Sequence, residues 1–303
     1  MTTNQLRAHL AMLGANVLWG GMAPMVKIVM ASGLVTSLML TNFRMAGAAV
    51  LFWCTSLFTP REHVPAADLL RLAGAAMLGI VFNQGCYVFG VGLTSPGEAS
   101  VITTTMPMWV MLLAAVLLHE PITLKKAGGI VLGAAGALIL VFSSASAVTS
   151  SASNPALGDV LVLTAQLSYA LYLTFYRNFI RKYSVVTLMK WMFLFASLAV
   201  VPLSLPQWLA TDWKSFTLAE AGGAAYIVVG ATFLSYICVM IGQKNLRPTL
   251  VGMYNYVQPV VACAIGIMLG LDTFTAIKIL AVALIFSGVY LVNISKAAKI
   301  DKN

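Results

Sequence analysis

The stretch "SPGEASVITTTMPMW" at residues 95–109 sets three threonines and Pro107 inside an otherwise apolar run. Proline has no N–H to offer the carbonyl four residues earlier, and its ring displaces that carbonyl. Pro107 therefore frees the carbonyl of Thr103. If this stretch crosses a bilayer, the freed carbonyl is tolerated only against other protein or a water-filled cavity. The stretch thus predicts a broken helix that faces the inside of a membrane protein.

The composition of the whole chain agrees with that prediction. Of the 303 residues, 60% are hydrophobic and 9% are charged, and the mean hydropathy is +0.91. Soluble domains carry about 25% charged residues, so this chain could not cover a water-facing surface. We expect an all-α polytopic membrane protein, because a spanning helix needs about 20 mainly apolar residues. Ten such segments are predicted, at 9–30, 36–58, 69–91, 97–118, 123–142, 158–178, 187–206, 219–241, 249–269 and 275–295.

Basic residues predict the orientation, because cytoplasmic loops carry an excess of Lys and Arg. With the N-terminus inside, fourteen Lys and Arg residues fall in cytoplasmic segments, and only Lys214 and Lys278 fall outside. Both termini are therefore predicted to be cytoplasmic. The first apolar segment is longer than the core of a signal peptide, roughly 7–15 residues. We expect it to remain as a spanning helix in the plasma membrane, which is the inner membrane in a Gram-negative cell.

The two halves of the chain are similar to each other. Shifts of 152 and 150 residues pair Pro96 with Pro248, Pro107 with Pro259, Glu120 with Asp272, Gly136 with Gly288, Ala15 with Ala165, Asn16 with Gln166, Trp19 with Tyr169 and Lys27 with Arg177. With five helices per half, the second half enters the membrane the other way up. Such inverted repeats place a substrate site near the midplane. The predicted division is a first repeat at 1–142, a polar linker at 143–157, a second repeat at 158–296 and a basic cytoplasmic tail at 297–303.

Polar side chains at predicted membrane depth gather in six of the ten segments, which predicts a central cavity between them. The candidate substrate-binding residues are Asn16, Trp19, Asn83, Gln84, Tyr87, Thr103, Thr104, Gln166, Tyr169, Tyr172, Tyr236, Asn255 and Tyr256. The predicted helix-breaking residues are Pro24, Pro107 and Pro259. A kink alone would also explain each proline, since transmembrane helices use proline more often than soluble ones. The paired occurrence in both halves favours a cavity.

Two charged residues are further candidates. Arg44 lies well inside the segment 36–58. An intramembrane arginine is a functional candidate by default, and the alternative is that it pairs with backbone or reaches the interface. All nine carboxylates fall in loops or at predicted helix ends, so we expect no buried proton relay built on Asp or Glu. Glu98 is the acid placed to couple transport to an ion, if transport is coupled.

Catalytic and metal-binding patterns are missing from the sequence. The three histidines lie at predicted helix ends, and the four cysteines show no metal-ligand spacing. We expect no enzyme activity, no cofactor, no bound metal and no nucleic-acid partner. The expected partners are a small-molecule substrate and the lipid bilayer. A monomer is expected, with a homodimer left open.

These features resemble the drug/metabolite transporter superfamily, in particular its ten-helix EamA-like members. The motifs that carry the resemblance are "NVLWGGMAP" at 16–24, "NFRM" at 42–45, "MP" at 106–107, "HEP" at 119–121 and "QPVVACAIGIMLGLD" at 258–272. The resemblance covers almost the whole chain and implies a basket-like bundle around a central cavity. It also implies acids at Glu120 and Asp272, as here. Tyr169 stands where the family often has Trp.

The predicted function is secondary transport of a small metabolite by alternating access, and the resemblance suggests export. Aromatic rings beside amides suit amino acids or related compounds, because a ring can stack while amides bind the polar end. The alternative is efflux of lipophilic or cationic drugs, which would favour a carboxylate in the cavity. A non-transporting intramembrane enzyme or sensor is the least favoured class. The substrate, the direction, the coupling ion and the open side stay unspecified.

Overall fold

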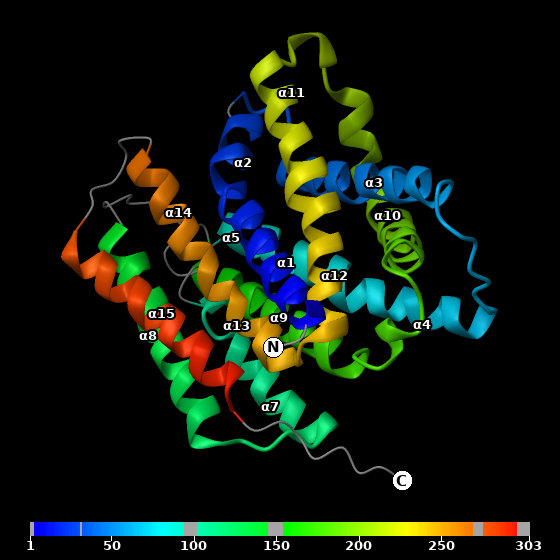
Figure 1. Ribbon diagram of the computed structural model, residues 1–303. Helices are drawn as coiled ribbons and strands as arrows, with labels where there is room; N and C mark the ends of the chain where they lie inside the picture. Colours follow the sequence, from blue (N-terminus) through cyan, green and yellow to red (C-terminus); the bar gives the residue numbers. More distant parts are fainter. Residues whose placement is uncertain (1–2, 31, 94–101, 145–153, 269–274, 296–303) are drawn as a thin grey trace.

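The computed structural model describes residues 3–30, 32–93, 102–144, 154–268 and 275–295, and over these residues every regular element is a helix (Figure 1). The first half contains α1 (Thr3–Gly20), α2 (Met22–Met30), α3 (Ser37–Ser56), α4 (Ala66–Ala76), η1 (Met77–Phe82), α5 (Asn83–Leu93), α7 (Met106–Leu118) and α8 (Leu124–Ser144). The second half contains α9 (Pro155–Phe175), η2 (Phe179–Arg181), α10 (Val185–Ala210), η3 (Trp213–Ser215), α11 (Leu218–Ala225), η4 (Tyr226–Leu234), α12 (Ser235–Asn245), α13 (Pro248–Met253), η5 (Tyr254–Tyr256), α14 (Val257–Met268) and α15 (Ala276–Asn293).

Within the residues that the structure describes, six helices are long and apolar enough to cross a membrane. Four of them are α3, α9, α10 and α15, and the other two are composite helices at Ala66–Gly90 and Leu218–Asn245. Met106–Leu118 is a shorter apolar helix. The prediction of an all-α, multi-pass membrane protein is therefore confirmed. The number ten and the cytoplasmic side of the termini remain predictions.

Three of the expected spans are interrupted, each close to a proline. The first span breaks at Gly21, and Pro24 lies in the first turn of α2. A turn precedes α7, which has Pro107 in its first turn. In the second half the 3₁₀ segment η5 separates α13 from α14, and Pro259 lies in the first turn of α14. A first-turn proline costs no helical hydrogen bond, so each proline begins a new helix instead of bending a continuous one.

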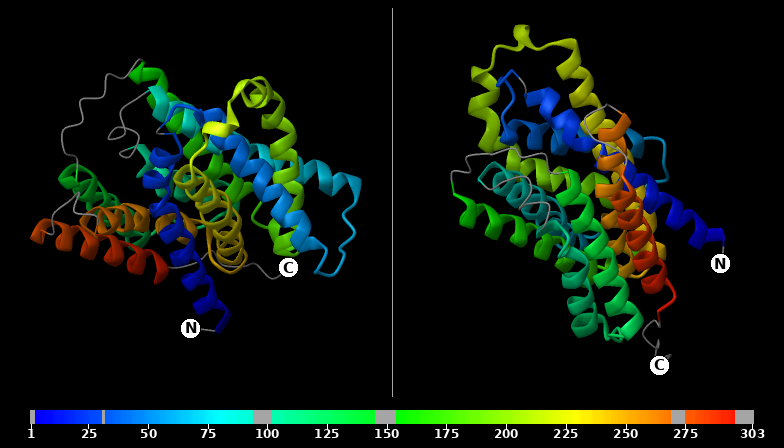
Figure 2. Two further views of the ribbon diagram at one scale, coloured as in Figure 1. Left: turned by 90° about the horizontal axis from the view of Figure 1, so that it is seen from above. Right: turned by 90° about the vertical axis from the view of Figure 1, so that its left-hand side faces the viewer.

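The helices α8 and α15 pack side by side, as three views agree (Figures 1 and 2). Their contacts are reciprocal. A Cβ at Gly129 would lie 2.7 Å from the carbonyl oxygen of Gly288, and a Cβ at Gly136 would lie 2.5 Å from that of Ala281. The 152-residue shift turns the first pair into the second. Contacts that exchange partners in this way are typical of a two-fold axis, and they make the two helices antiparallel.

A second likeness between the halves lies in two π-helical segments. The segment η1 joins α4 to α5, and η4 joins α11 to α12. The same 152-residue shift carries η1 onto the last six residues of η4. Because π-helical turns leave the ordinary helical hydrogen-bond ladder, they are frequent at functional sites. In both halves the α-helix that follows begins with two polar or aromatic residues, which form the centre of the site described next.

Candidate functional site

A polar cluster joins the two π-interrupted helices at the centre of the bundle. The side-chain amide of Gln84 donates to the hydroxyl of Tyr236 at 3.3 Å and to the side-chain carbonyl of Asn83 at 3.0 Å. Gln84 and Tyr236 are equivalent residues of the two halves under the 152-residue shift. Asn83 also donates across the halves, to the backbone carbonyl of Ala165 at 3.0 Å. Three predicted site residues are thus brought together here.

Arg44 enters this cluster from α3 and is only 6% exposed. Its Nη1 donates to the side-chain carbonyl of Gln84 at 2.5 Å, and its Nε donates to the hydroxyl of Thr232 at 3.1 Å. Tyr87 lies one turn after Asn83 on α5 and is half-buried. Within the described part of the chain, no Asp or Glu oxygen lies within 4.0 Å of the Arg44 side chain. The Arg44 side chain is therefore buried inside the protein and does not extend to the membrane surface. It forms no ion pair with an Asp or Glu in the described part of the chain.

A small cavity lies beside the guanidinium. It has room for about one water molecule. The lining residues are Thr41, Arg44, Met45, Ile80, Gln84, Phe193, Thr232 and Tyr236. The expected central cavity is therefore closed to substrate-sized molecules at this point, where Gln84 contacts both Arg44 and Tyr236.

Aromatic rings form one wall of the cluster. The indole N–H of Trp19 donates to the carbonyl of Ala231, in η4, at 2.9 Å. The Trp19 ring meets the Tyr236 ring edge-on, with centroids 6.0 Å apart, and Phe193 meets Tyr236 from another side at 5.0 Å. Edge-to-face pairs at such distances are favourable. The predicted residues Trp19 and Tyr236 are thus neighbours, and Phe193 joins them.

A second cluster surrounds the breaks near Pro107 and Pro259. The side-chain amide of Gln258 donates to Asn16 at 3.1 Å and to Asn255 at 3.3 Å. Asn255 in turn donates to the sulfur of Met106 at 3.3 Å, at the start of α7. The helix α7 also packs against α13. Asn255 therefore faces protein, between the two broken helices.

The turn before α7 receives a hydrogen bond from the other half. The hydroxyl of Tyr256 donates to the backbone carbonyl of Thr104 at 2.9 Å. Tyr256 and Thr104 are again equivalent residues under the 152-residue shift. Thr104 and Tyr256 are buried, whereas Thr103 is half-buried. The Thr104 carbonyl thus accepts a hydrogen bond across the interface between the halves, and such bonds satisfy buried backbone groups at membrane depth.

The remaining aromatic candidates form a third cluster, between α9 and α12. Tyr172 donates its hydroxyl hydrogen to the side-chain carbonyl of Gln243 at 3.1 Å, and the amide of Gln243 donates to Tyr169 at 3.2 Å. Gln166 is buried one turn earlier on α9. Gln166, Tyr169 and Tyr172 lie on α9 and Gln243 lies on α12. None of these four residues is among those that line the small cavity beside Arg44.

The predicted site residues leave out four residues of these clusters: Phe193, Thr232, Gln243 and Gln258. Gln258 directly precedes Pro259, and an amide next to a helix break is a usable signal. Gln243 lies two residues beyond the predicted segment 219–241, beside Lys244. Thr232 carries no sequence signal that separates it from packing threonines. Glu98 lies outside the described residues, as do the side-chain surroundings of Pro24.

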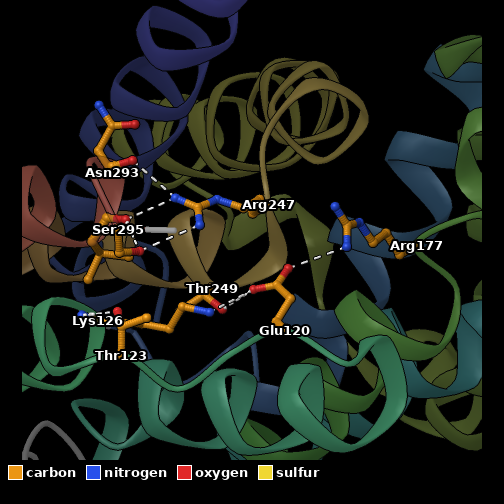
Figure 3. A network of polar contacts seen from close by, with 9 residues as sticks. Glu120, Thr123, Lys126, Arg177, Arg247, Thr249, Asn293 and Ser295 are labelled. Carbon is orange, nitrogen blue, oxygen red and sulfur yellow. Dashed lines mark hydrogen bonds and ion pairs between the residues drawn. The ribbon is translucent and has the colours of Figure 1, made fainter. Parts of the chain in front are cut away.

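An ion network lies at one end of the bundle (Figure 3). The carboxylate of Glu120 is 1% exposed and lies 3.0 Å from Nζ of Lys126 and 3.3 Å from Nη1 of Arg177. The hydroxyl of Thr249 donates to it at 3.2 Å. Glu120 and Lys126 belong to the first half, whereas Arg177 and Thr249 belong to the second. One buried carboxylate therefore connects both halves, a role that its position in "HEP" did not predict.

The same end holds further contacts between the halves. Asp68 accepts hydrogen bonds from Lys182 and Tyr183, and Glu62 accepts from the backbone N–H of Ser184 with both oxygens, at 3.1 and 2.9 Å. Burial of Glu62 opposes its ionisation, but hydrogen bonds from Thr187 and Ser184 outweigh this and hold its pKa below the usual value. The contacts of Glu62, Asp68 and Glu120 thus hold the halves together at this end.

Arg247 fastens the C-terminus of α15 beside this network. Its Nη2 donates to the carbonyls of Val292 and Asn293, both at 3.0 Å, and Nη1 lies 3.5 Å from the Ser295 hydroxyl (Figure 3). A cation at a helix C-terminus satisfies terminal carbonyls and the helix dipole. Arg247 thereby ties the start of α13 to the end of α15.

Comparisons with known proteins extend these observations. A sequence model of the EamA-like transporter family matches residues 6–142 and 156–294. The uncharacterized transporter YetK of Bacillus subtilis is 23% identical over 96% of this chain and 86% of its own length. The protein WALLS ARE THIN 1 of Arabidopsis thaliana is 26% identical over 97% of this chain and 84% of its own length. A crystal structure of a protein with 19% identity has the same fold, with a TM-score of 0.76 over 94% of this chain and 95% of that one.

Proposed function

The chain belongs to the EamA-like transporter family and is a multi-pass membrane transporter, and from this premise we propose that it exports small metabolites such as amino acids or related compounds. Transport proceeds by alternating access in the plasma membrane. The substrate binds between the two π-interrupted helices and the two proline-broken helices. Two inverted repeats face each other there.

The observation that carries this proposal is the meeting of equivalent residues at the centre. Gln84 contacts Tyr236, and Tyr256 contacts the carbonyl of Thr104. In each pair the 152-residue shift relates one partner to the other. In inverted-repeat transporters the substrate site lies at the repeat interface near the midplane, and broken helices form it. A substrate entering this interface replaces hydrogen bonds that the two halves now make to each other.

The ion network around Glu120, at one end of the bundle, supports alternating access. Glu120 is held by Lys126 of its own half and Arg177 of the other half. Opening this end requires the Arg177 contact to part, whereas the Lys126 contact stays within one half. The described state therefore represents a conformation in which the predicted cytoplasmic end is closed.

The chemistry of the centre favours amphipathic metabolites over cationic drugs. Amides and hydroxyls lie beside the rings of Trp19 and Tyr236, so a substrate can stack an apolar part while it hydrogen-bonds a polar part. The described charge at the centre is the positive one of Arg44, which repels cations. This weakens the drug-efflux alternative.

Transport of labelled metabolites by the purified protein in proteoliposomes, with and without a pH gradient, tests the proposal. We expect flux of at least one amino acid. Asn83→Leu and Asn255→Leu should reduce that flux at least tenfold while expression stays normal, because each removes hydrogen bonds between the halves. Asn178→Leu, at an exposed position in a turn, is the matched control and should transport normally. Full activity of both site variants would show that the site is elsewhere.

A further inference from the structure

Arg44 is a buried cation whose described partners are all neutral. Among the described residues its hydrogen bonds go to Gln84 and Thr232, and the other hydroxyl-bearing residues that line the small cavity with it are Thr41 and Tyr236. Charged groups inside a membrane are costly, and they persist where they pair with one another or serve function. The carboxylates that the structure describes instead cluster at the ends of the bundle, as Glu120 and Asp68 do. The positive charge at the centre thus has no counter-ion in the described part of the chain.

The guanidinium still has donors to offer. It carries five N–H groups, of which the described contacts use one on Nε and one on Nη1. The remaining N–H groups include both of those on Nη2, and Arg44 lines the small central cavity. Two parallel N–H groups of arginine match the two oxygens of a carboxylate. The cavity therefore adjoins an incomplete binding site for an anionic group.

Gln84 now occupies part of that site. Its side-chain carbonyl accepts from Nη1 of Arg44 at 2.5 Å, while its amide donates to Tyr236. A carboxylate is a stronger acceptor than an amide carbonyl, because a charge-assisted hydrogen bond is roughly twice as strong as a neutral one. An incoming carboxylate can displace the Gln84 carbonyl from Arg44 and accept from the nearby tyrosine hydroxyls as well.

Arg44 is the one charged residue among those that line the small cavity. The 150- and 152-residue shifts place Leu194 and Ala196 opposite Arg44 in the second half, so the symmetry of the fold supplies no second cation there. The rest of the substrate meets the rings of Trp19, Phe193 and Tyr236 instead. The surroundings suit a molecule with one carboxylate and an apolar or aromatic body.

We propose that Arg44 binds the carboxylate of the transported molecule, so that a carboxylate is required of the substrate and an amine is not. This inference rests on the proposed transport function and narrows its substrate class to amino acids and organic acids. Amino acids bind through the α-carboxylate. Acids that lack the amine are substrates too, whereas the corresponding amines are not.

A ligand series on the unaltered protein tests this directly. The probes are L-phenylalanine, 3-phenylpropionate, which lacks the amine, and 2-phenylethylamine and phenylalaninamide, which lack the carboxylate. Binding is measured as thermal stabilisation of the purified protein in detergent, and transport as flux in proteoliposomes. We expect both carboxylates to stabilise the protein, with at least tenfold lower Kd than either amine. Equal or tighter binding of the amines, or no stabilisation by any carboxylate, would overturn the proposal.

Variants of Arg44 connect the effect to this residue. Arg44→Gln should raise the Kd of 3-phenylpropionate at least tenfold. Arg44→Lys should bind more tightly than Arg44→Gln but more weakly than the unaltered protein, because lysine keeps the charge but not the planar pair of donors. Arg61→Gln, in an exposed loop, is the matched control and should bind as the unaltered protein does. Wild-type affinity in Arg44→Gln would refute the assignment.

The two proposals fail in different ways. If carboxylates bind and Arg44→Gln abolishes binding, but no flux occurs in proteoliposomes, the anion site stands and the transport proposal fails. If amines are transported while carboxylates neither bind nor move, transport stands and the role of Arg44 is wrong.

Discussion

At the interface between the halves, the side chain of Tyr256 packs against α8 at Gly133. Tyr256 is 1% exposed and reaches the Thr104 carbonyl with its hydroxyl. Its ring lies against α8 where Gly133 has no side chain, and a Cβ there would come within 2.5 Å of ring carbon Cδ2. A contact this short cannot be accommodated unless the ring moves. The glycine is therefore required by the tyrosine that it faces.

Gly133→Ala is expected to reduce transport and stability through this contact. Overpacking a buried site costs about 1–3 kcal/mol, which exceeds the gain of roughly 1 kcal/mol from replacing glycine by alanine in a helix. Gly128→Ala on the same helix meets nothing within 4 Å and keeps only the gain. Melting temperatures in detergent check this: Gly133→Ala should melt below the unaltered protein and Gly128→Ala at or above it. The reverse order would contradict the packing argument.

Among the elements, α10 has an N-terminus that is stabilised by residues from both halves. Its N-cap Ser184 accepts from the backbone N–H of Thr187 and also donates its own backbone N–H to Glu62, from the loop before α4. Lys244 adds a favourable charge near Glu62. Carboxylates are favourable at a helix N-terminus. The start of α10 is thus fixed by an acid that lies more than a hundred residues earlier in the chain.

The pH dependence of stability follows from the lowered pKa of Glu62. A carboxylate with a lowered pKa in the folded state stabilises the protein above its unfolded pKa, about 4.3, and loses this contribution as the pH falls through the folded value. Glu62→Gln should therefore melt a few °C lower at pH 7, for a contribution on the order of 1 kcal/mol. The difference should shrink as the pH falls below about 4.3 and then through the lower pKa of Glu62 in the folded protein. A difference that grows on acidification would contradict the assignment.

How much of these elements the sequence could predict depends on the kind of signal. The breaks near Pro107 and Pro259 were predictable because proline removes a specific hydrogen bond. The π segments were not, because η1 is built from ordinary apolar residues, "MLGIVF" at 77–82, and only tertiary contacts select its wider turn. The polar residues of the centre could be predicted as a set. Their pairing could not, because contacts such as that of Gln84 with Tyr236 join residues 152 positions apart.

The molecule as a whole is held closed at one end by opposite charges. The first half supplies Glu62, Asp68 and Glu120. The second half supplies Lys182 for Asp68, Arg177 for Glu120 and the backbone N–H of Ser184 for Glu62. Breaking a buried ion pair by removal of one partner costs roughly 3–5 kcal/mol, because the other charge is left uncompensated. In Glu120→Gln the buried Lys126 and the half-buried Arg177 would both lose their acid.

Glu120→Gln is accordingly expected to open this end of the molecule. Hydrogen exchange of the α13 backbone, residues 248–253, should become faster, and transport should slow because the closed state is less populated. Lys126→Met in the same protein removes the excess charge and should restore part of the protection. Asp212→Asn, at an exposed position, is the control. Unchanged exchange of α13 in Glu120→Gln would show that the network does not hold the halves together.

The break at Gly21 has a consequence for how the bundle moves. α1 and α2 meet there at a joint, whereas the matching helix of the second half, α9, runs unbroken from Pro155 to Phe175. Under the proposed alternating access, the first half would bend at this joint while its counterpart tilts as a rod. The two orientations would then be reached by unlike motions and would differ in energy. The empty transporter would therefore favour one of them before any gradient acts on it.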